Sequence, residues 1–335
     1  GTETLTNKTL TTPTLTGTSV VASLDISGDI DVDGTTNLDV VDIDGAVDMA
    51  TTLAVAGNVD FNGDLDVDGT TETDVLTING SQFNYKAFGT SSIMIGDTTT
   101  GTIDAANYNT GLGVDVFAAL TSGDENTAVG TGALGSSTTA SGNTAVGRNA
   151  LLANTTGTRN TALGYATLDA STTGDYNTAV GGLALSTNTT ADNNTGVGFQ
   201  ALYLNTTGTA NTAVGALSLD ANTTASHVTA VGNSALGANT TGTRNTAVGS
   251  EAADAINTGQ DNTAIGALAL SADTKGNYST AIGRAALKTQ NFTSSTSAHN
   301  TAVGYGAGEA VTTGANNTLI GSLAGDAITT GAANV

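Results

Sequence analysis

A repeat of 17 residues is the feature that most constrains how this chain folds. The phrase Asn126-Thr-Ala-Val-Gly130 returns with little change along the chain, interrupted by one insertion of four residues. Self-similarity at a fixed short period is the signature of a stacked repeat architecture. Fourteen copies begin at Ser92, Asn109, Asn126, Asn143, Asn160, Asn177, Asn194, Asn211, Val228, Asn245, Asn262, Ser279, Asn300 and Asn317, and Asn334-Val335 opens another.

Each position of the repeat, counted from 1 at these residues, has its own chemistry. Position four is always Val, Ile or Leu, position nine is usually Leu, and positions 12 to 15 resemble the turn sequence Asn-Thr-Thr-Gly. Position five is always Gly, which suits a backbone with positive φ or a close approach of two backbones. These structural glycines include Gly130, Gly147, Gly164, Gly181, Gly198, Gly215, Gly232, Gly249, Gly266, Gly283, Gly304 and Gly321.

The repeat predicts an all-β chain that folds as a β-solenoid or β-roll. Gly and several Thr in every copy disfavour helix. We expect two short strands in each copy, at positions 1–5 and 7–11, with positions four and nine pointing inward. Stacked coils would rise by about 4.8 Å each, which is the spacing of paired strands. Identical Asn and Thr side chains would then bond along the stack.

The composition of a coil predicts that one column is not enough. Hydrophobic residues make up 38% of the chain, mostly Ala and Val, and aromatic residues only 4%. Burial at about 25 cal/mol per Å² barely offsets the cost of ordering such a backbone. We therefore expect a parallel homotrimer, in which three columns bury one sheet each against a shared axis.

Four segments are predicted. Residues 1–21 are a Thr-rich connector, 22–80 an acidic β-shaft with a 35-residue repeat, 81–91 an aromatic collar, and 92–335 the β-roll. In the shaft, apolar residues alternate with Asp, which predicts a slender intertwined strand region with an acidic outer face. The chain opens at Gly1 with no signal-peptide pattern, so we expect it to be a section of something larger.

Two sets of acidic residues are candidates for chemistry, and both favour a structural interpretation. Aspartates in the shaft match the opening of a calcium loop, but Val40 and Val75 stand where that loop needs Glu. A solvated acidic face is favoured, and no cofactor is predicted. Glu309 and Asp326 share position ten in adjacent coils, so their carboxylates could lie at the separation of a glycosidase pair. Any repeat stacks equivalent residues in this way, so the spacing alone does not indicate hydrolysis. The weak calcium candidates are Asp29, Asp31, Asp33, Asp64, Asp66 and Asp68.

Position 17, just before each new copy, carries large polar and aromatic residues. Residues one copy apart are neighbours on a solenoid, so this position forms an edge along the roll. A tolerant exposed corner is the favoured interpretation, and a receptor-contacting ridge is the alternative. The residues concerned are Tyr108, Arg159, Tyr176, His227, Arg244, Tyr278 and His299.

Charge and composition exclude several classes of function. With 30 acidic against 8 basic residues, nucleic acid and an anionic membrane surface are unsuitable partners. No Cys is present, and no apolar stretch is long enough for membrane insertion. The two histidines do not form a Ser-His-Asp triad.

The repeat Asn-Thr-Ala-Val/Ile-Gly-x-x-Ala-Leu resembles the head repeats of trimeric autotransporter adhesins, which implies a left-handed parallel β-roll trimer. The period of 17 is longer than the coil of those heads. The same motif resembles repeats in phage tail fibres, and the phrase Thr4-Leu-Thr-Asn-Lys-Thr-Leu-Thr11 resembles one from marine tailed phages.

We expect a homotrimeric fibre section in the tail of a tailed phage, without enzymatic activity. It would join other virion tail proteins through a missing N-terminal region and present a distal tip to a host cell-surface receptor. The alternative is a trimeric adhesin on a bacterial cell surface. An enzymatic tailspike and an ice-binding solenoid are less favoured, the latter because Thr at position two is followed by Val rather than Thr at position four.

Overall fold

A computed structural model describes residues 105–335 and, before them, four strands. These are β1 Leu76–Ile78, β2 Ser81–Phe83, β3 Tyr85–Phe88 and β4 Ser92–Gly96. Strands β1 and β2 pair antiparallel, as do β3 and β4. The predicted connector, nearly all of the shaft and the six Asp candidates for calcium lie outside the described residues.

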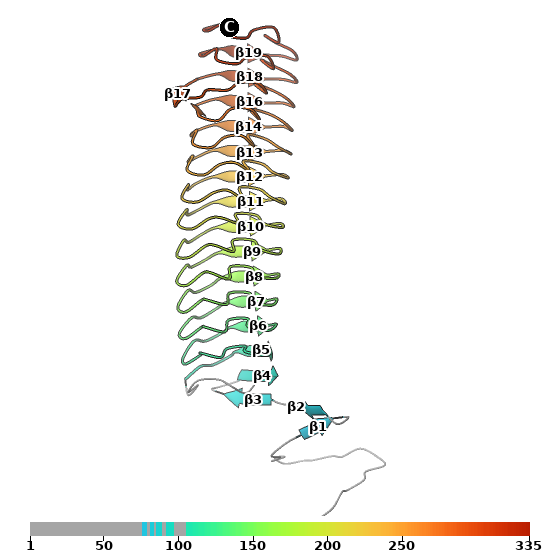
Figure 1. Ribbon diagram of the computed structural model, residues 1–335, viewed down its shortest axis with the longest axis vertical. Helices are drawn as coiled ribbons and strands as arrows, with labels where there is room; N and C mark the ends of the chain where they lie inside the picture. The colour runs from blue at the N-terminus through green and yellow to red at the C-terminus, as the bar shows by residue number, and fades with distance from the viewer. Residues whose placement is uncertain (1–75, 79–80, 84, 89–91, 97–104) are drawn as a thin grey trace, which may run out of the picture. The chain divides into compact units, whose positions relative to one another are not determined.

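The repeat region is a β-solenoid with one short strand in each coil (Figure 1). Its sheet has fifteen strands among the described residues; β3 lies at one end, and from β4 onward all neighbours pair parallel. The register places each Thr on the Thr of the next coil, as for Thr178, Thr195 and Thr212. The strands are β5 Thr110–Gly113, β6 Thr127–Val129, β7 Thr144–Val146, β8 Thr161–Leu163, β9 Thr178–Val180, β10 Thr195–Val197, β11 Thr212–Val214, β12 Thr229–Val231, β13 Thr246–Val248, β14 Thr263–Ile265, β16 Thr280–Ile282, β18 Thr301–Val303 and β19 Thr318–Ile320.

The second strand predicted in each coil, at positions 7–11, is wrong. Backbone φ is positive at positions seven and nine, for example 60° at Leu183 and 52° at Leu185. A backbone that repeatedly enters the left-handed region cannot form an extended strand. Its amides still bond along the stack, because Leu183 donates to Tyr165 O on one side and Leu185 to Ala201 O on the other. The solenoid is thus held by ladders in its turns as well as in its sheet.

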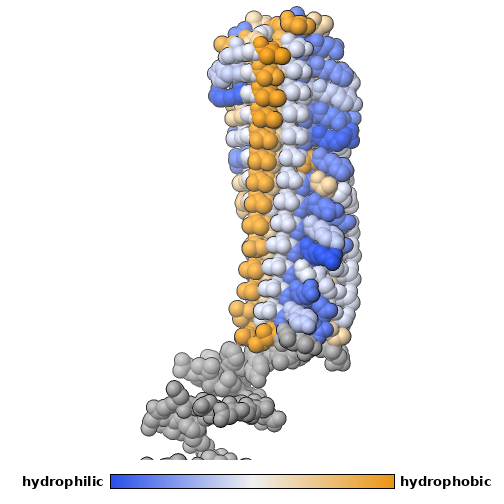
Figure 2. Space-filling model, turned by 180° about the vertical axis from the view of Figure 1, so that it is seen from behind, coloured by the Kyte–Doolittle hydropathy of each residue, from blue (hydrophilic) through white to orange (hydrophobic). Residues whose placement is uncertain are grey.

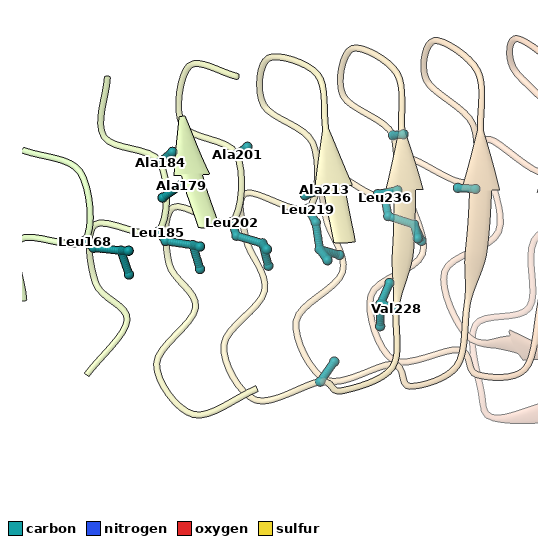
Figure 3. Close-up of a cluster of buried hydrophobic side chains, with 14 of the residues drawn as sticks. Leu168, Ala179, Ala184, Leu185, Ala201, Leu202, Ala213, Leu219, Val228 and Leu236 are labelled. Carbon is teal, nitrogen blue, oxygen red and sulfur yellow. The ribbon is translucent and has the colours of Figure 1, made fainter. Parts of the chain in front are cut away.

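The inward pair is positions three and nine, so the prediction for position four is wrong. Ala179 and Leu185 are fully buried, whereas Val180, on the outer face of the same strand as Ala179, is only partly buried. Side chains alternate across a strand, and with Ala at position three facing the interior, positions two and four face outward. Figure 3 shows the stacked leucines, among them Leu168, Leu185 and Leu202, which confirm position nine as an inward position.

A column of buried asparagines at position one runs along the solenoid, as the stacking of identical side chains predicted. Asn177 is representative: its backbone N–H and its Nδ2 both donate to Oδ1 of Asn160, at 2.9 and 3.1 Å. Its Nδ2 also donates to Ala191 O at 2.8 Å, and its Oδ1 accepts the N–H of Asn194. Each Asn therefore joins three coils, and buried polar groups of this kind stabilise only when they are paired.

The Asn column is interrupted at Val228, where we expect a stabilising substitution. Val228 donates its own N–H to Asn211, but it offers no side-chain acceptor to the next coil. Val228→Asn would accept the N–H of Asn245 and donate toward Gly242 O, as other members of the column do. We expect a gain of about 1 kcal/mol in the free energy of unfolding, measured by chemical denaturation. Asn194→Val, which makes the same interruption elsewhere, should lose stability, and a gain from both changes would contradict the proposed role of the column.

Candidate functional site

An apolar stripe runs along the outside of the parallel sheet (Figure 2). It is formed by the position-four residues, which the sequence had placed in the interior. Val146, Val214 and Val248 are each 37% exposed. One apolar residue from every coil is on this face, and contiguous exposed apolar patches mark interaction surfaces. The apolar stripe comprises Leu112, Val129, Val146, Leu163, Val180, Val197, Val214, Val231, Val248, Ile265, Ile282, Val303 and Ile320.

The seven residues predicted at position 17 all lie on one exposed edge. Each has positive φ, between 48° at His299 and 61° at Tyr278. Residues at position 17 of successive coils are neighbours, so contacts form between pairs along the edge and the seven residues do not gather in one cluster. Tyr278 and His299 stack with their ring centroids 5.1 Å apart, and Arg159 lies over the Tyr176 ring at 5.4 Å. The edge is thus a row of local contacts along the rod.

Arg244 forms the strongest charged contact of this edge, and Asp261 in the next coil is its partner. The Nε and Nη2 atoms of Arg244 donate to the two carboxylate oxygens at 2.6 and 2.9 Å. These hydrogen bonds lower the pKa of the Asp261 carboxyl and raise that of the guanidinium. Arg244 is exposed and Asp261 is partly exposed, and ion pairs at the surface contribute little stability.

A second row of Arg–Tyr pairs lies at position six, and the sequence interpretation missed it. Arg148 lies 5.9 Å from the centre of the Tyr165 ring, and Arg284 lies 5.7 Å from that of Tyr305. Phe199, at the same position, is 54% exposed. The signal was present in the sequence as Arg and Tyr one copy apart. Arg over an exposed aromatic ring contributes about 0.5–1 kcal/mol.

Glu309 and Asp326 occupy the same position in adjacent coils, as the repeat requires. Glu309 pairs with Lys288 of the preceding coil at 3.6 Å, and both side chains are about two-fifths exposed. A solvent-exposed ion pair of this kind is ordinary on a protein surface. Nothing in this arrangement favours hydrolysis over the structural interpretation.

Asp254 carries a titratable group that we expect to weaken the fold at neutral pH. Partial burial, together with the nearby Glu251, raises the pKa of its carboxyl, and its Oδ1 atom is buried without a hydrogen-bond partner. The native state therefore binds a proton more tightly than the unfolded chain. Stability then falls as the pH rises from about 4 through the raised pKa.

Asp254→Asn should consequently raise the melting temperature at pH 7, and the difference should shrink toward pH 4. Asp261→Asn is the control with the opposite sign, because the Asp261 pKa is lowered and its carboxylate stabilises the fold at pH 7. Melting curves by circular dichroism between pH 4 and 7 measure both. A gain from Asp254→Asn that is the same at every pH would contradict the electrostatic explanation.

Neither a metal centre nor a membrane span emerges from the described part of the chain. No group of three or more His, Asp or Glu side chains lies close enough there to hold a metal ion. Among the described residues, no helix is long and apolar enough to cross a bilayer. Comparison with known proteins found no matching family model, no matching curated protein and no matching solved structure.

Proposed function

We propose that this chain is a section of a homotrimeric fibre, in which the apolar stripe of each copy packs against the same stripe of two others. The apolar stripe is the observation that supports the proposal. It is continuous, and it has no charged residue at any of its positions. Three parallel copies related by an axis along the rod present the same residues at the same height. A closed three-fold packing of this kind brings the equivalent stripe residues of all three copies together at each height and buries them.

The stripe also answers the shortage of buried apolar surface within one coil. The interior of a coil holds Ala at positions three and eight and one Leu at position nine, such as Ala213 and Leu219. Position four places a Val, Ile or Leu on the outer face of every coil of the stripe. Burying it between columns would add roughly 25 cal/mol for every Å² removed from water. The stability of the trimer would therefore increase with the number of coils, since each coil adds its own contact between copies.

A fibre in the tail of a tailed phage is the setting we propose, with attachment to a host cell as its purpose. The rod would provide reach and stiffness, and other virion tail proteins would hold one end while a receptor-binding tip is carried at the other. The resemblance of the repeat and of the phrase at residues 4–11 supports this setting. A bacterial trimeric adhesin has the same architecture, and the reading frame around the chain distinguishes the two. An anchor to a phage tail would favour the first, and a signal peptide with a membrane barrel the second.

Sedimentation equilibrium on the intact chain tests the trimer. We expect a mass three times the 32.7 kDa of one chain. The double change Val214→Asp and Val248→Asp should yield a folded monomer, because a trimer would bury six unpaired carboxylates. Leu204→Asp is the matched control: Leu204 is 43% exposed but lies outside the apolar stripe. A monomeric native chain, or a trimer that tolerates the double change, would overturn the proposal.

A further inference from the structure

The four-residue insertion in the repeat builds a feature that regular coils do not have. Residues 291–298 depart from the 17-residue period, and Thr296–Ser297 form β17. This strand pairs in parallel with β15, Gly276–Asn277, of the preceding coil. Figure 1 shows β17 at the outer edge of the stack, away from the main sheet. The insertion thus adds a wall to the Thr-rich corner of the solenoid.

Buried polar contacts fix this wall in place. Asp273 stands at position 12, where several other coils have Asn, and it is fully buried. One of its carboxylate oxygens accepts the N–H groups of Gly276 and Phe292 at 3.0 and 3.1 Å, and the other accepts Nε2 of Gln290 at 2.6 Å. The Phe292 side chain is itself buried. The insertion is therefore held by buried contacts, which fix the positions of its exposed side chains.

A shallow cavity, open to solvent, lies in this corner; its volume of about 560 Å³ is comparable to the roughly 300–1,000 Å³ of small-molecule sites. Three consecutive coils contribute to it, and every lining side chain is polar. The lining residues are Asn257, Thr258, Thr274, Lys275, Asn291 and Thr293.

Two asparagines in the cavity are oriented by their neighbours so that their donor groups remain unused. Thr240 Oγ1 donates to Oδ1 of Asn257 at 2.9 Å. In the same way, Thr274 Oγ1 donates to Oδ1 of Asn291 at 3.1 Å. Regular coils have Thr at this position, where its hydroxyl donates to a backbone carbonyl, as from Thr172 to Thr189 O. Here the Nδ2 groups of both asparagines are without a protein acceptor, and Lys275 lines the same cavity.

We propose that this cavity binds a saccharide that carries a single carboxylate. Amide N–H groups and threonine hydroxyls are suited to the hydroxyl and ring oxygens of a sugar, and Lys275 is suited to one carboxylate. A polyanion is a poor fit, because Lys275 is the one cationic residue among the six that line the cavity. The inference does not depend on the proposed fibre, since all six lining residues come from one chain. A monomer in solution would leave it intact.

Isothermal titration of the intact chain tests the site, with sialyllactose and cellobiouronic acid as probes and lactose as the neutral comparison. We expect millimolar binding of at least one acidic probe and at least tenfold weaker binding of lactose. Lys275→Ala should weaken the acidic probe tenfold or more, and Lys288→Ala, which changes a lysine outside the cavity, should leave it unchanged. Lys275 is exposed, so its replacement leaves the fold in place.

A second pair of variants tests the oriented amides. Asn257→Asp and Asn291→Asp keep the acceptor for the Thr hydroxyl but replace the free donor with a carboxylate oxygen, so each should abolish binding of the acidic probe. Circular dichroism confirms that these variants remain folded. Failure of both acidic probes to bind at 10 mM, equal binding of lactose, or unchanged binding by Lys275→Ala would overturn the proposal.

Discussion

Gly181→Ala should destabilise the solenoid by about 3 kcal/mol or more, whereas Gly182→Ala, one residue further on, should be neutral or slightly stabilising. Gly181 has φ +125°, a conformation that other residues avoid at a cost of roughly 1–3 kcal/mol. A Cβ there would also lie 2.5 Å from the backbone oxygen of Gly198 in the next coil. Neither atom can move without separating two coils.

Gly182 is a close control because it shares the chain neighbourhood but not the constraint. Its Cβ would meet only the Phe199 ring, at the ordinary contact distance of 3.8 Å. Removing a Gly at an unstrained position lowers the entropy of the unfolded chain, which contributes about 0.4–1 kcal/mol in favour of folding. Thermal unfolding and amide exchange in β9 and β10 measure both variants. Similar losses from the two changes would show that the column of glycines does not set the coil spacing.

The sequence alone predicted this column for the correct reason, yet it placed position four on the wrong side. An invariant Gly indicates positive φ or a close backbone approach, and Gly181 and Gly198 show both. Val180 and Ala179 are adjacent on one strand, and only one of them faces inward. Hydrophobicity favours Val for the interior, but the coil is too narrow for Val beside Leu185 on every level. The small residue is inside because the interior has little volume.

The surface sites were predicted less completely than the fold. The edge at position 17 follows from the period alone, since any residue there faces outward. The cavity beside Lys275 depends on how the insertion folds, and the period says nothing about residues 291–298. The orientation of Asn257 and Asn291 depends on hydroxyl partners in neighbouring coils, which no pattern within one repeat predicts. Nearly all of the shaft, with its six Asp candidates for calcium, lies outside the described residues.

A volume exchange inside the coil leads to the second large effect. Where position nine is Leu, position 12 is in most copies Asn; where position nine is small, position 12 is aliphatic. Ala253 is accompanied by Ile256, and Gly308 by Val311. Ile256 and Val311 are fully buried. A Cβ on Gly308 would lie 3.4 Å from Cγ2 of Val311, and still closer to Leu319 and Leu287 of the adjacent coils. Positions nine and 12 therefore border one space in the core, and at Gly308 the side chain of Leu319 from the next coil also reaches it.

Leu236→Ala should therefore cost about 2–5 kcal/mol alone, and Asn239→Ile in the same chain should restore much of the loss. Leu236 is fully buried, so its truncation leaves a cavity. Asn239 is next to the coil of Ile256 and is at the end of its own hydrogen-bonded column, where its Nδ2 lies 3.4 Å from Oδ1 of Asn222. Asn239→Ile alone should also destabilise, because Leu236 already occupies the space it needs.

A double-mutant cycle at these positions measures the exchange directly. Chemical denaturation of the two single variants and the double variant should give a coupling free energy of about 1–3 kcal/mol, with the double variant more stable than the sum of the singles predicts. Leu204→Ala, at a side chain that is 43% exposed, is the control and should cost well under 1 kcal/mol. Additive losses would mean that positions nine and 12 are independent. Coupling would instead explain why the repeat can lose its Leu at Gly308 and Gly325 without losing the coil.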